Sequence, residues 1–378
     1  MHVLTSKERL VRQTLGQEID RIPSLGGWIG GARNLAALAE ISLDQYLADP
    51  VRGVIAAHQR LGVDGMVPPV IPTSAEQIRT GLVLEEGFAG IEPEALEARA
   101  AAIPDSEKEF LAAFDPAREE RRYRDHFEGA FRDWGSIVPI PNFWELGGPF
   151  PLYQEFGYGA FFMACVLYPD AVEKIWWSKA LVARECAKIL CGLYGEYDLV
   201  PLLFCGEDLC NNKGPMVSTD FLRERYLPLV RMIVEPLVDS GIRLIHHCDG
   251  DVRPLVSDFI RIGFSGLQGF QYELGVDPGT YAGVKGPFGQ ELLFFTGMSI
   301  TRTLPFGTVD DVRREVEYFV EFTGGGRGMF LFTTNVTGVE VPSQNLSAGY
   351  EHLQTIRPDF SQPRGGGSWP WGVTHPDG

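Results

Sequence analysis

"RLIHHCDGDVRPLVSDFIRIGFSGLQGFQ" (243–271) is the clearest structural unit in this chain of 378 residues. A short apolar run at 243–248 leads into a polar loop, a helical pattern covers 252–263, and a second strand-like run occupies 266–271. Short runs that are apolar on both faces and bounded by glycine or aspartate are typical of parallel strands buried under helices. The stretch therefore predicts a strand–helix–strand unit of a parallel α/β protein.

The same alternation recurs along most of the chain. Six further runs of strand length lie at 23–28, 65–70, 136–141, 199–204, 292–297 and 328–333. Further helical patterns occupy 49–62, 170–195, 218–241 and 308–325. Eight repeats of strand and helix predict a (β/α)8 TIM barrel. A two-domain doubly wound protein is the alternative, but no Gly-rich dinucleotide turn follows the first run.

Two segments fall outside this repeat. Residues 84–130 are rich in alanine and in charge, and we expect them to form a helical insertion after the second strand. Residues 361–378 are rich in glycine and proline, and we expect a largely disordered tail there. The chain is therefore interpreted as one barrel domain over 1–360, followed by the tail 361–378.

Composition narrows the function classes. The 50 acidic residues exceed the 33 basic ones, and the net charge of -17 argues against a nucleic-acid partner. The N-terminus has no apolar signal region and no apolar run is long enough to span a bilayer, so we expect a cytoplasmic protein without a membrane partner. The six cysteines contain no CxxC pair and are expected to be reduced. These features suit an enzyme that acts on a small molecule.

In a barrel of this type the chemistry lies at the C-terminal ends of the strands. The polar groups that follow the predicted strands there are the candidate acids and bases Glu207, Asp208, His247 and Asp249. The candidate substrate contacts are Trp28, Arg33, Asn142, Trp144, Gln271 and Asn335. For either acid of the "GEDLC" loop alone, capping of backbone amides is an equally good interpretation.

The two histidines of 243–252 also predict a metal site. Because side chains alternate along a strand, His246 and Cys248 share one face, while His247 and Asp249 share the other. An imidazole and a thiolate at this spacing form half of a zinc site, which Cys205 or an acid of the neighbouring loop could complete. The competing interpretation is that the histidines are hydrogen-bonded and Cys248 is a small buried apolar residue. Without a metal, His246 or Asp249 would act as a general acid or base.

Several stretches, in this order, resemble the uroporphyrinogen decarboxylase superfamily. They are "SKERLVRQTLGQEIDRIP" (6–23), "GPFPLYQEFGYGAFFMACVLYPDAVEKI" (148–175), "GEDLCNNKGPMVSTDFLRERYLP" (206–228), "HHCDGDV" (246–252) and "VPSQNL" (341–346). The resemblance spans about residues 4–356 and implies a TIM barrel. The superfamily includes corrinoid-linked methyltransferases, so it also implies zinc, a corrinoid carried by a partner protein, and often a homodimer.

The departures from the superfamily are informative. The haem-pathway decarboxylases carry an arginine-rich motif after the first strand and an aspartate after the second, whereas this chain has "GGWIGGARN" (26–34) and "VPPVIPTS" (67–74). A true haem-pathway uroporphyrinogen decarboxylase is therefore not expected. The zinc methyltransferases use H-x-C on the fifth strand and a later cysteine. His246 and Cys248 match the first part, but the later cysteine is absent from its place near Asn335.

Three hypotheses follow. The first is a zinc-dependent, corrinoid-linked methyltransferase or O-demethylase component that acts on a small methylated substrate or a thiol. The second is a metal-free decarboxylase or lyase of a small aromatic acid, in which Arg33 holds a carboxylate and His246, Asp208 or Asp249 protonates the carbanion. The third is a degenerate barrel with a binding role only.

Overall fold

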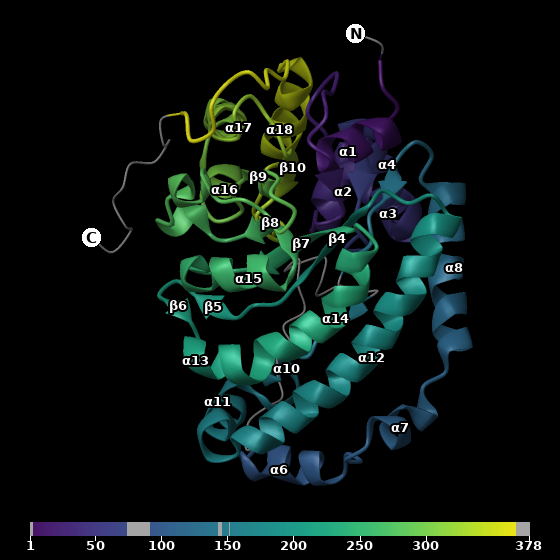
Figure 1. The fold of residues 1–378 in the computed structure, drawn as a ribbon. Helices are drawn as coiled ribbons and strands as arrows, with labels where there is room; N and C mark the ends of the chain where they lie inside the picture. Colours follow the sequence, from purple (N-terminus) through teal and green to yellow (C-terminus); the bar gives the residue numbers. More distant parts are fainter. Residues whose placement is uncertain (1–2, 74–90, 143–145, 151, 368–378) are drawn as a thin grey trace.

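The computed structural model describes residues 3–73, 91–142, 146–150 and 152–367. Within them the chain is an α/β protein whose parallel sheet curls into a half-barrel, with helices packed around it (Figure 1). The five-stranded sheet has the order β10-β9-β8-β7-β4, at Met329–Thr333, Leu293–Met298, Phe264–Gly269, Arg243–Cys248 and Leu202–Gly206. A three-stranded parallel sheet has the order β1-β2-β3, at Leu25–Gly26, Gly65–Met66 and Val138–Pro139.

The two sheets meet along both of their edges. A parallel bridge pairs Ser24 with Leu331, and another pairs Asn142 with Phe204. At these seams Leu331 N donates to Pro23 O and Phe204 N donates to Pro141 O, both at 3.0 Å. Each of the eight runs predicted as strands overlaps one of the parallel strands in the described residues. The parallel α/β class is confirmed.

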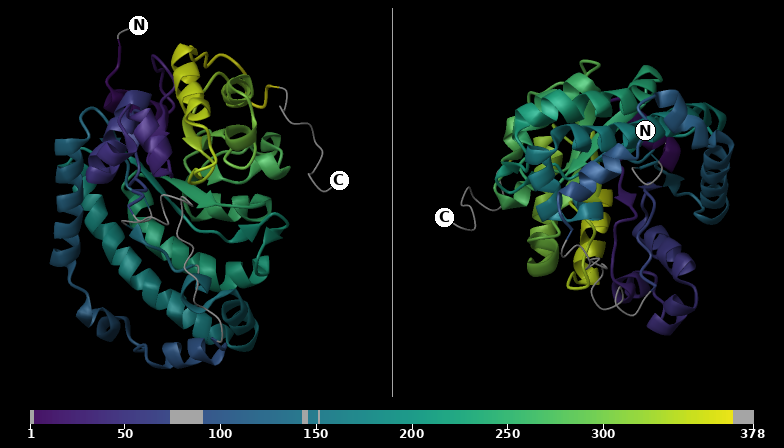
Figure 2. Two further views of the ribbon diagram at one scale, coloured as in Figure 1. Left: turned by 180° about the vertical axis from the view of Figure 1, so that it is seen from behind. Right: turned by 90° about the horizontal axis from the view of Figure 1, so that it is seen from below.

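Helices follow the strands and cover their outer side (Figure 2). They are α1 (Ser6–Thr14), α2 (Ala32–Leu38), α3 (Leu43–Ala48), α4 (Pro50–Leu61), α6 (Glu94–Ala101), α7 (Glu107–Phe110), α8 (Pro116–Asp133), α10 (Tyr153–Phe156), α11 (Tyr158–Leu167), α12 (Pro169–Glu196), α13 (Thr219–Phe221), α14 (Leu227–Asp239), α15 (Val256–Ile262), α16 (Thr303–Phe306), α17 (Val309–Phe322) and α18 (Ser343–Thr355). Their ends follow local chemistry. In α4, for example, the Asp49 side chain accepts from Arg52 N, Pro50 occupies the first turn, and Gly62 ends the helix at φ 66°.

Alternate strand residues build two separate apolar layers. Phe204, Ile245 and Phe332 belong to an inner cluster enclosed by the strands. Their sequence neighbours, such as Leu203 and Leu244, pack instead against the helices. Each such side chain stabilises the fold by about 1.5–3 kcal/mol when it is fully buried. The strands are therefore buried on both faces, which is why their sequences read as continuous apolar runs.

Several local features differ from the prediction. The helix expected over 218–241 is divided by a π-helical turn at Leu222–Tyr226, next to Pro228, which has no N–H to continue the hydrogen-bond ladder. A short antiparallel hairpin of β5 (Cys210–Asn211) and β6 (Gly214–Pro215) lies in the loop after β4. It was not expected, because strands of two residues leave no periodic signal.

The two segments outside the repeat are partly described. Helices α6, α7 and α8 lie between β2 and β3 as predicted, while residues 84–90 of the expected insertion lie outside the described part. At the other end, Arg364 Nη2 donates to Leu292 O at 2.9 Å, and residues 368–378 of the expected tail are not described. In the described part of the chain, no helix has the length and apolarity needed to cross a membrane.

Candidate active site

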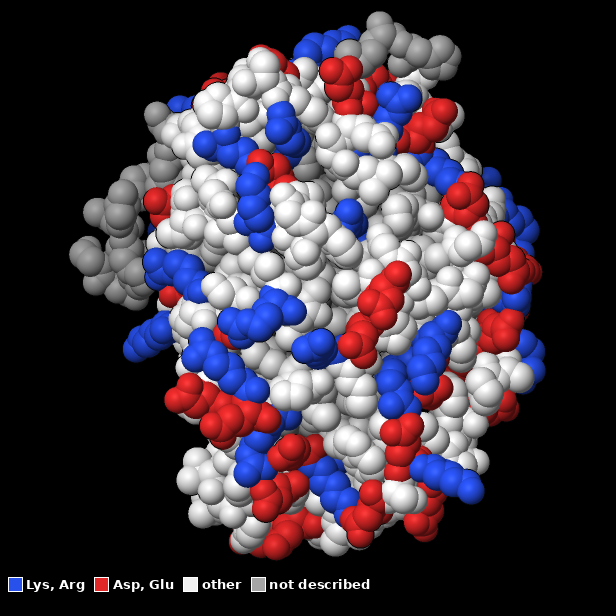
Figure 3. Space-filling view, in the orientation of Figure 1, with Lys and Arg blue, Asp and Glu red and all other residues white. Residues whose placement is uncertain are grey.

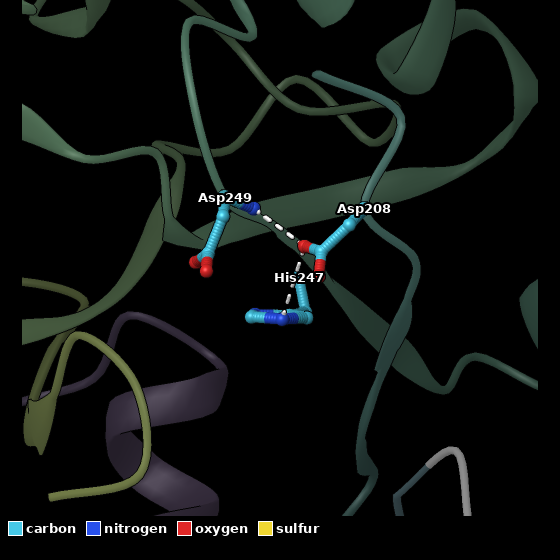
Figure 4. A group of neighbouring side chains, drawn as sticks. All are labelled: Asp208, His247 and Asp249. Atoms are coloured by element: carbon cyan, nitrogen blue, oxygen red, sulfur yellow. Dashed lines mark hydrogen bonds and ion pairs between the residues drawn. The ribbon is translucent and has the colours of Figure 1, made fainter. Parts of the chain in front are cut away.

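Three polar side chains converge at the C-terminal ends of β4 and β7 (Figure 4). Asp208 follows β4, His247 is the fifth residue of β7, and Asp249 follows β7 directly. One ligand atom from each lies within 4.8 Å of the other two. Asp208 Oδ1 accepts from Asp249 N at 2.8 Å and lies 3.5 Å from His247 Nε2. The cluster thus joins two neighbouring strand ends through one carboxylate.

His247 is held on several sides. Its Nδ1 is 2.5 Å from Gln268 Oε1, on the adjacent strand β8. The ring of Trp28 meets the imidazole edge-on, with centroids 5.3 Å apart, and the Phe204 ring lies at 5.8 Å. These contacts fix the plane of the imidazole and leave the side chain only 9% exposed.

Asp249 combines burial with incomplete hydrogen bonding. Its Oδ2 accepts from Asn335 Nδ2 at 2.7 Å. Its Oδ1 is buried and has no hydrogen-bond partner among the described residues. Burial raises the pKa of Asp249 to about 6, and the neighbouring Asp208 adds to the shift, while His247 and Asn335 oppose it. A buried acceptor without a donor indicates a place that a proton or a cation can fill.

Glu207 turns away from this cluster toward α14. Its Oε2 accepts from Phe150 N at 2.9 Å and from the hydroxyl of Tyr226, which ends the π-helical turn. Burial raises the pKa of Glu207 to about 8. Near neutral pH this carboxyl therefore holds its proton, which makes it a potential acid.

A pocket connects Glu207, Asp208 and His247 with the surface. Its volume is about 310 Å³, and it is lined by Gly147, Gly148, Phe150, Gln154, Glu155, Lys179, Gly206, Glu207, Asp208 and His247. The volume is at the small end of ligand sites in proteins. Lys179 of α12, ion-paired with Glu155, is the basic side chain among the described residues that line it. The pocket therefore suits a small molecule that reaches His247 and Asp208.

The residues predicted as a zinc site lie on the other side of the strands. The His246 ring stacks on Phe259 of α15, with centroids 3.8 Å apart, and burial lowers its pKa to about 3. Cys248 Sγ accepts from Leu209 N at 3.3 Å. Burial raises the pKa of both Cys248 and Cys205 well above that of an ordinary thiol.

His246 and Cys248 share a face, as the alternation predicted, but that face packs against helices. Cys205 and His246 line a separate cavity of about 30 Å³ in that layer. Among the described residues, the group with ligand spacing contains their neighbours His247 and Asp249 instead.

The remaining predicted residues are placed as follows. Trp28 and Asn335 contact His247 and Asp249, as described above. Asn142 is buried at the seam of β3 and β4, and Trp144 lies outside the described residues. Arg33 is exposed on α2, and it does not line the pocket that reaches His247. Gln271 is half-buried just after β8, with the backbone at φ 30°.

Gln268 is one of the polar groups at the predicted strand ends, and it contacts His247. Two residues that the sequence did not mark as functional also belong to this environment. Tyr226 contacts Glu207, and Lys179 lines the pocket. Tyr226 and Lys179 lie within amphipathic helices, where nothing local distinguishes them from structural residues.

The cluster fits a divalent cation. Two carboxylates and one imidazole offer oxygen and nitrogen donors, and the partnerless Asp249 Oδ1 would gain a ligand bond. No thiolate takes part, so the donor set is harder than the His/Cys set predicted from the sequence.

Both signs of charge alternate over the face of the molecule in Figure 3, with no continuous basic surface among the described residues there.

Comparisons with known proteins show a likeness in fold but none in sequence family. No protein-family model matches the sequence, and a search of curated proteins finds no match. The chain is similar to a methyltransferase from Methanosarcina mazei, with a TM-score of 0.60, 16% sequence identity, and coverage of 93% of this chain and 98% of that chain. At this identity the likeness shows a common fold.

Proposed function

We propose that this chain is a metal-dependent methyltransferase of the uroporphyrinogen decarboxylase superfamily that removes a methyl group from a small methoxy compound. The observation that carries the proposal is the convergence of Asp208, His247 and Asp249 at two strand ends. The likeness in fold to a methyltransferase supports it. We also infer that the two parallel sheets close into one (β/α)8 barrel, because a bridge joins them at each seam.

We assign to these three residues zinc or another divalent transition metal. Three protein ligands leave a coordination position for substrate, as in catalytic zinc sites. When bound, such an ion polarises a substrate oxygen as a Lewis acid. The zinc enzymes of the superfamily use an H-x-C spacing, and His247-x-Asp249 repeats that spacing one residue further along. Asn335, near the place of the later cysteine, hydrogen-bonds Asp249.

The donor set also favours one of the two substrate classes considered from the sequence. Sites built from thiolates suit soft ligands, whereas carboxylates and imidazole leave the ion a harder Lewis acid. A methoxy or hydroxyl oxygen therefore fits this site better than a thiol. The pocket of about 310 Å³ limits the substrate to a small compound.

In the proposed transfer, the bond between the methyl carbon and the substrate oxygen breaks, the methyl group passes to a nucleophilic acceptor, and the leaving oxygen takes up a proton. We assign that proton to Glu207, which lines the same pocket. Trp28 and Phe204 shield the imidazole of His247 from water. A corrinoid on a partner protein as the acceptor stays a prediction from the resemblance, and so does a homodimer.

The decarboxylase hypothesis remains the alternative. It assigned Arg33 to a substrate carboxylate, but Arg33 is exposed, and the basic residue in the pocket is Lys179. No specific contact in the described residues favours it over methyl transfer.

Metal analysis of the chelator-washed protein, reloaded with Zn²⁺ or Mn²⁺, tests the proposal. The variants are Asp249→Ala and Asp251→Ala. Asp251 lies in the same loop but pairs with Arg253 and is outside the cluster, so it is a matched control. We expect about one ion per chain in the wild type and in Asp251→Ala, and none in Asp249→Ala.

The loaded protein is then incubated with a methoxyaromatic compound and cob(I)alamin, and methylcobalamin is followed by absorbance. Formation of methylcobalamin only in the metal-binding proteins supports the proposal. A wild type that takes up no metal, or an Asp249→Ala variant that retains it, contradicts the site.

A further inference from the structure

The side chain of Gln268 lies against His247 and is held by two hydrogen bonds of its own. It is the fifth residue of β8 and is 1% exposed. Its Nε2 donates to the carbonyl oxygens of Thr333 and Thr334, at 2.9 Å each, at the end of β10. Both amide hydrogens are used in these bonds. The reversed amide would set its oxygen against two carbonyl oxygens, so the orientation of Gln268 is fixed.

This orientation determines the tautomer of His247. Gln268 Oε1 is an acceptor, so His247 Nδ1, 2.5 Å away, must carry a hydrogen. In the neutral form of the imidazole, which has one N–H, Nε2 then bears the lone pair. That lone pair faces Asp208 Oδ1 at 3.5 Å. Two acceptors that face each other are stabilised by a cation between them.

We propose that Gln268 is a positioning residue that keeps the proton of His247 on Nδ1 and so presents Nε2 to the divalent cation of the site. The metal part of this inference rests on the proposed function, whereas the tautomer part does not. The aromatic contacts of Trp28 and Phe204 already hold the ring in place, so the contribution of Gln268 lies in proton placement. Groups that hydrogen-bond a ligand histidine change metal affinity by about 10–100-fold when removed.

The chain offers a matched control at another strand end. Gln13 is fully buried, and its Nε2 also donates to two backbone carbonyls, those of Gly326 and Met329, at 2.7 and 2.6 Å. Its described contacts do not include His247. Gln13→Met and Gln268→Met therefore remove the same kind of two-carbonyl anchor, with a side chain of similar shape, and only the second removes an acceptor from Nδ1.

The first measurement is nitrogen NMR of the metal-free wild-type protein labelled with ¹⁵N-histidine. The chain has 7 histidines, and comparison with His247→Ala assigns the relevant signals. We expect the Nδ1–H tautomer for His247. An Nε2–H tautomer in the wild type overturns the inference, and this outcome is independent of whether the protein binds metal.

The second measurement compares the two methionine variants. In Gln268→Met we expect a mixture of tautomers and a loss of Zn²⁺ affinity of about 10–100-fold by titration calorimetry. In Gln13→Met we expect reduced stability with wild-type tautomer and affinity. Equal affinities in both variants, or a pure Nδ1–H tautomer in Gln268→Met, contradict the assignment. A wild type that binds neither Zn²⁺ nor Mn²⁺ refutes the proposed metal site and leaves the tautomer result standing.

Discussion

The two faces of β7 differ in what surrounds them, although they alternate residue by residue. On the inner face, Ile245 packs in the apolar cluster between the strands, and His247 contacts Gln268 and Trp28. On the outer face, His246 stacks on Phe259. Of these two adjacent histidines, His247 therefore lies at a polar strand end, whereas His246 lies in an aromatic layer.

The difference shows how environment decides between chemistry and packing. Burial lowers the pKa of His246 to about 3, with the adjacent His247 adding to the shift, so its ring stays neutral and packs as an aromatic side chain. His247 has a fixed acceptor on one nitrogen and a carboxylate near the other. A shift of one residue in a strand exchanges the two faces completely.

The largest expected effect separates the two histidines. His247→Ala should lower Zn²⁺ affinity by roughly 100-fold or more, because it removes a ligand of the proposed site, and should change stability less. His246→Ala should keep the affinity but lower the free energy of unfolding by about 3 kcal/mol, because it leaves a cavity beside Phe259. Titration calorimetry and urea denaturation measure the two quantities. Loss of metal in His246→Ala alone would restore the outer face as the site.

The same comparison shows what could be predicted from the sequence. All eight parallel strands follow from apolar runs that are buried on both faces, and their order follows from the alternation with helices. Strands β1, β2 and β3 are shorter than predicted. Only two residues of each form ladder hydrogen bonds, whereas the apolar run in the sequence continues past them.

Within the site, alternation correctly grouped His246 with Cys248 and His247 with Asp249. It could not show which pair faces inward, because that depends on how the strand is rotated in the sheet. The contact of Asn335 with Asp249 joins residues 86 positions apart and has no local signal.

The second expected effect is a pH dependence of stability, and it concerns buried carboxyl groups other than Asp249. Glu315 of α17 is fully buried, and its Oε1 accepts from the Tyr272 hydroxyl at 2.6 Å and from Ser299 N at 2.8 Å. Burial raises the pKa of Glu315 to about 8, and the nearby Glu273 adds to the shift. Burial likewise raises the pKa of Glu273 to about 7, with Asp249 contributing.

These shifts set the direction of a pH dependence. A glutamate in the unfolded chain has a pKa of about 4.3 and loses its proton first. Between about pH 4 and 8 the unfolded state therefore binds fewer protons than the folded state, and stability falls as pH rises. Glu315→Gln keeps the acceptor and cannot ionise. We expect it to raise the free energy of unfolding at pH 8 by on the order of 2 kcal/mol, with little change near pH 4. Urea denaturation at both pH values measures this, and equal changes at both would contradict it.

A smaller effect tests the outer face again through its cysteine. Cys248→Ala removes a buried sulfur that accepts from Leu209 N, so we expect a loss of about 1 kcal/mol of stability and an unchanged metal content. Cys186→Ala, at a buried position of α12, is the matched control and should behave alike. Metal lost from Cys248→Ala but retained in Cys186→Ala would show that the thiol is a ligand after all.

The smallest expected effect concerns backbone strain at the end of β8. From the last residue of β8 onward the chain passes through three consecutive residues with positive φ, Gly269 at 84°, Phe270 at 35° and Gln271 at 30°. A residue with a side chain is strained in this region, and such strain is often retained beside functional sites. Gln271→Gly should therefore stabilise the protein, by up to about 1 kcal/mol. Glu40→Gly, at φ 56° and on the surface, relieves the same kind of strain but loses an exposed ion pair with Arg60, so it should stabilise the protein by somewhat less.

The two glycine variants should part in activity. If Gln271 contacts substrate, as the sequence predicted, Gln271→Gly gains stability and loses methyl transfer, whereas Glu40→Gly gains stability alone. Urea denaturation measures the change in stability, and the methylcobalamin assay measures the change in methyl transfer. Full activity in Gln271→Gly would show that the strained turn has a structural role alone. That role is to bring Phe270 N within 2.8 Å of the carbonyl oxygen of Cys248, which joins the ends of β7 and β8.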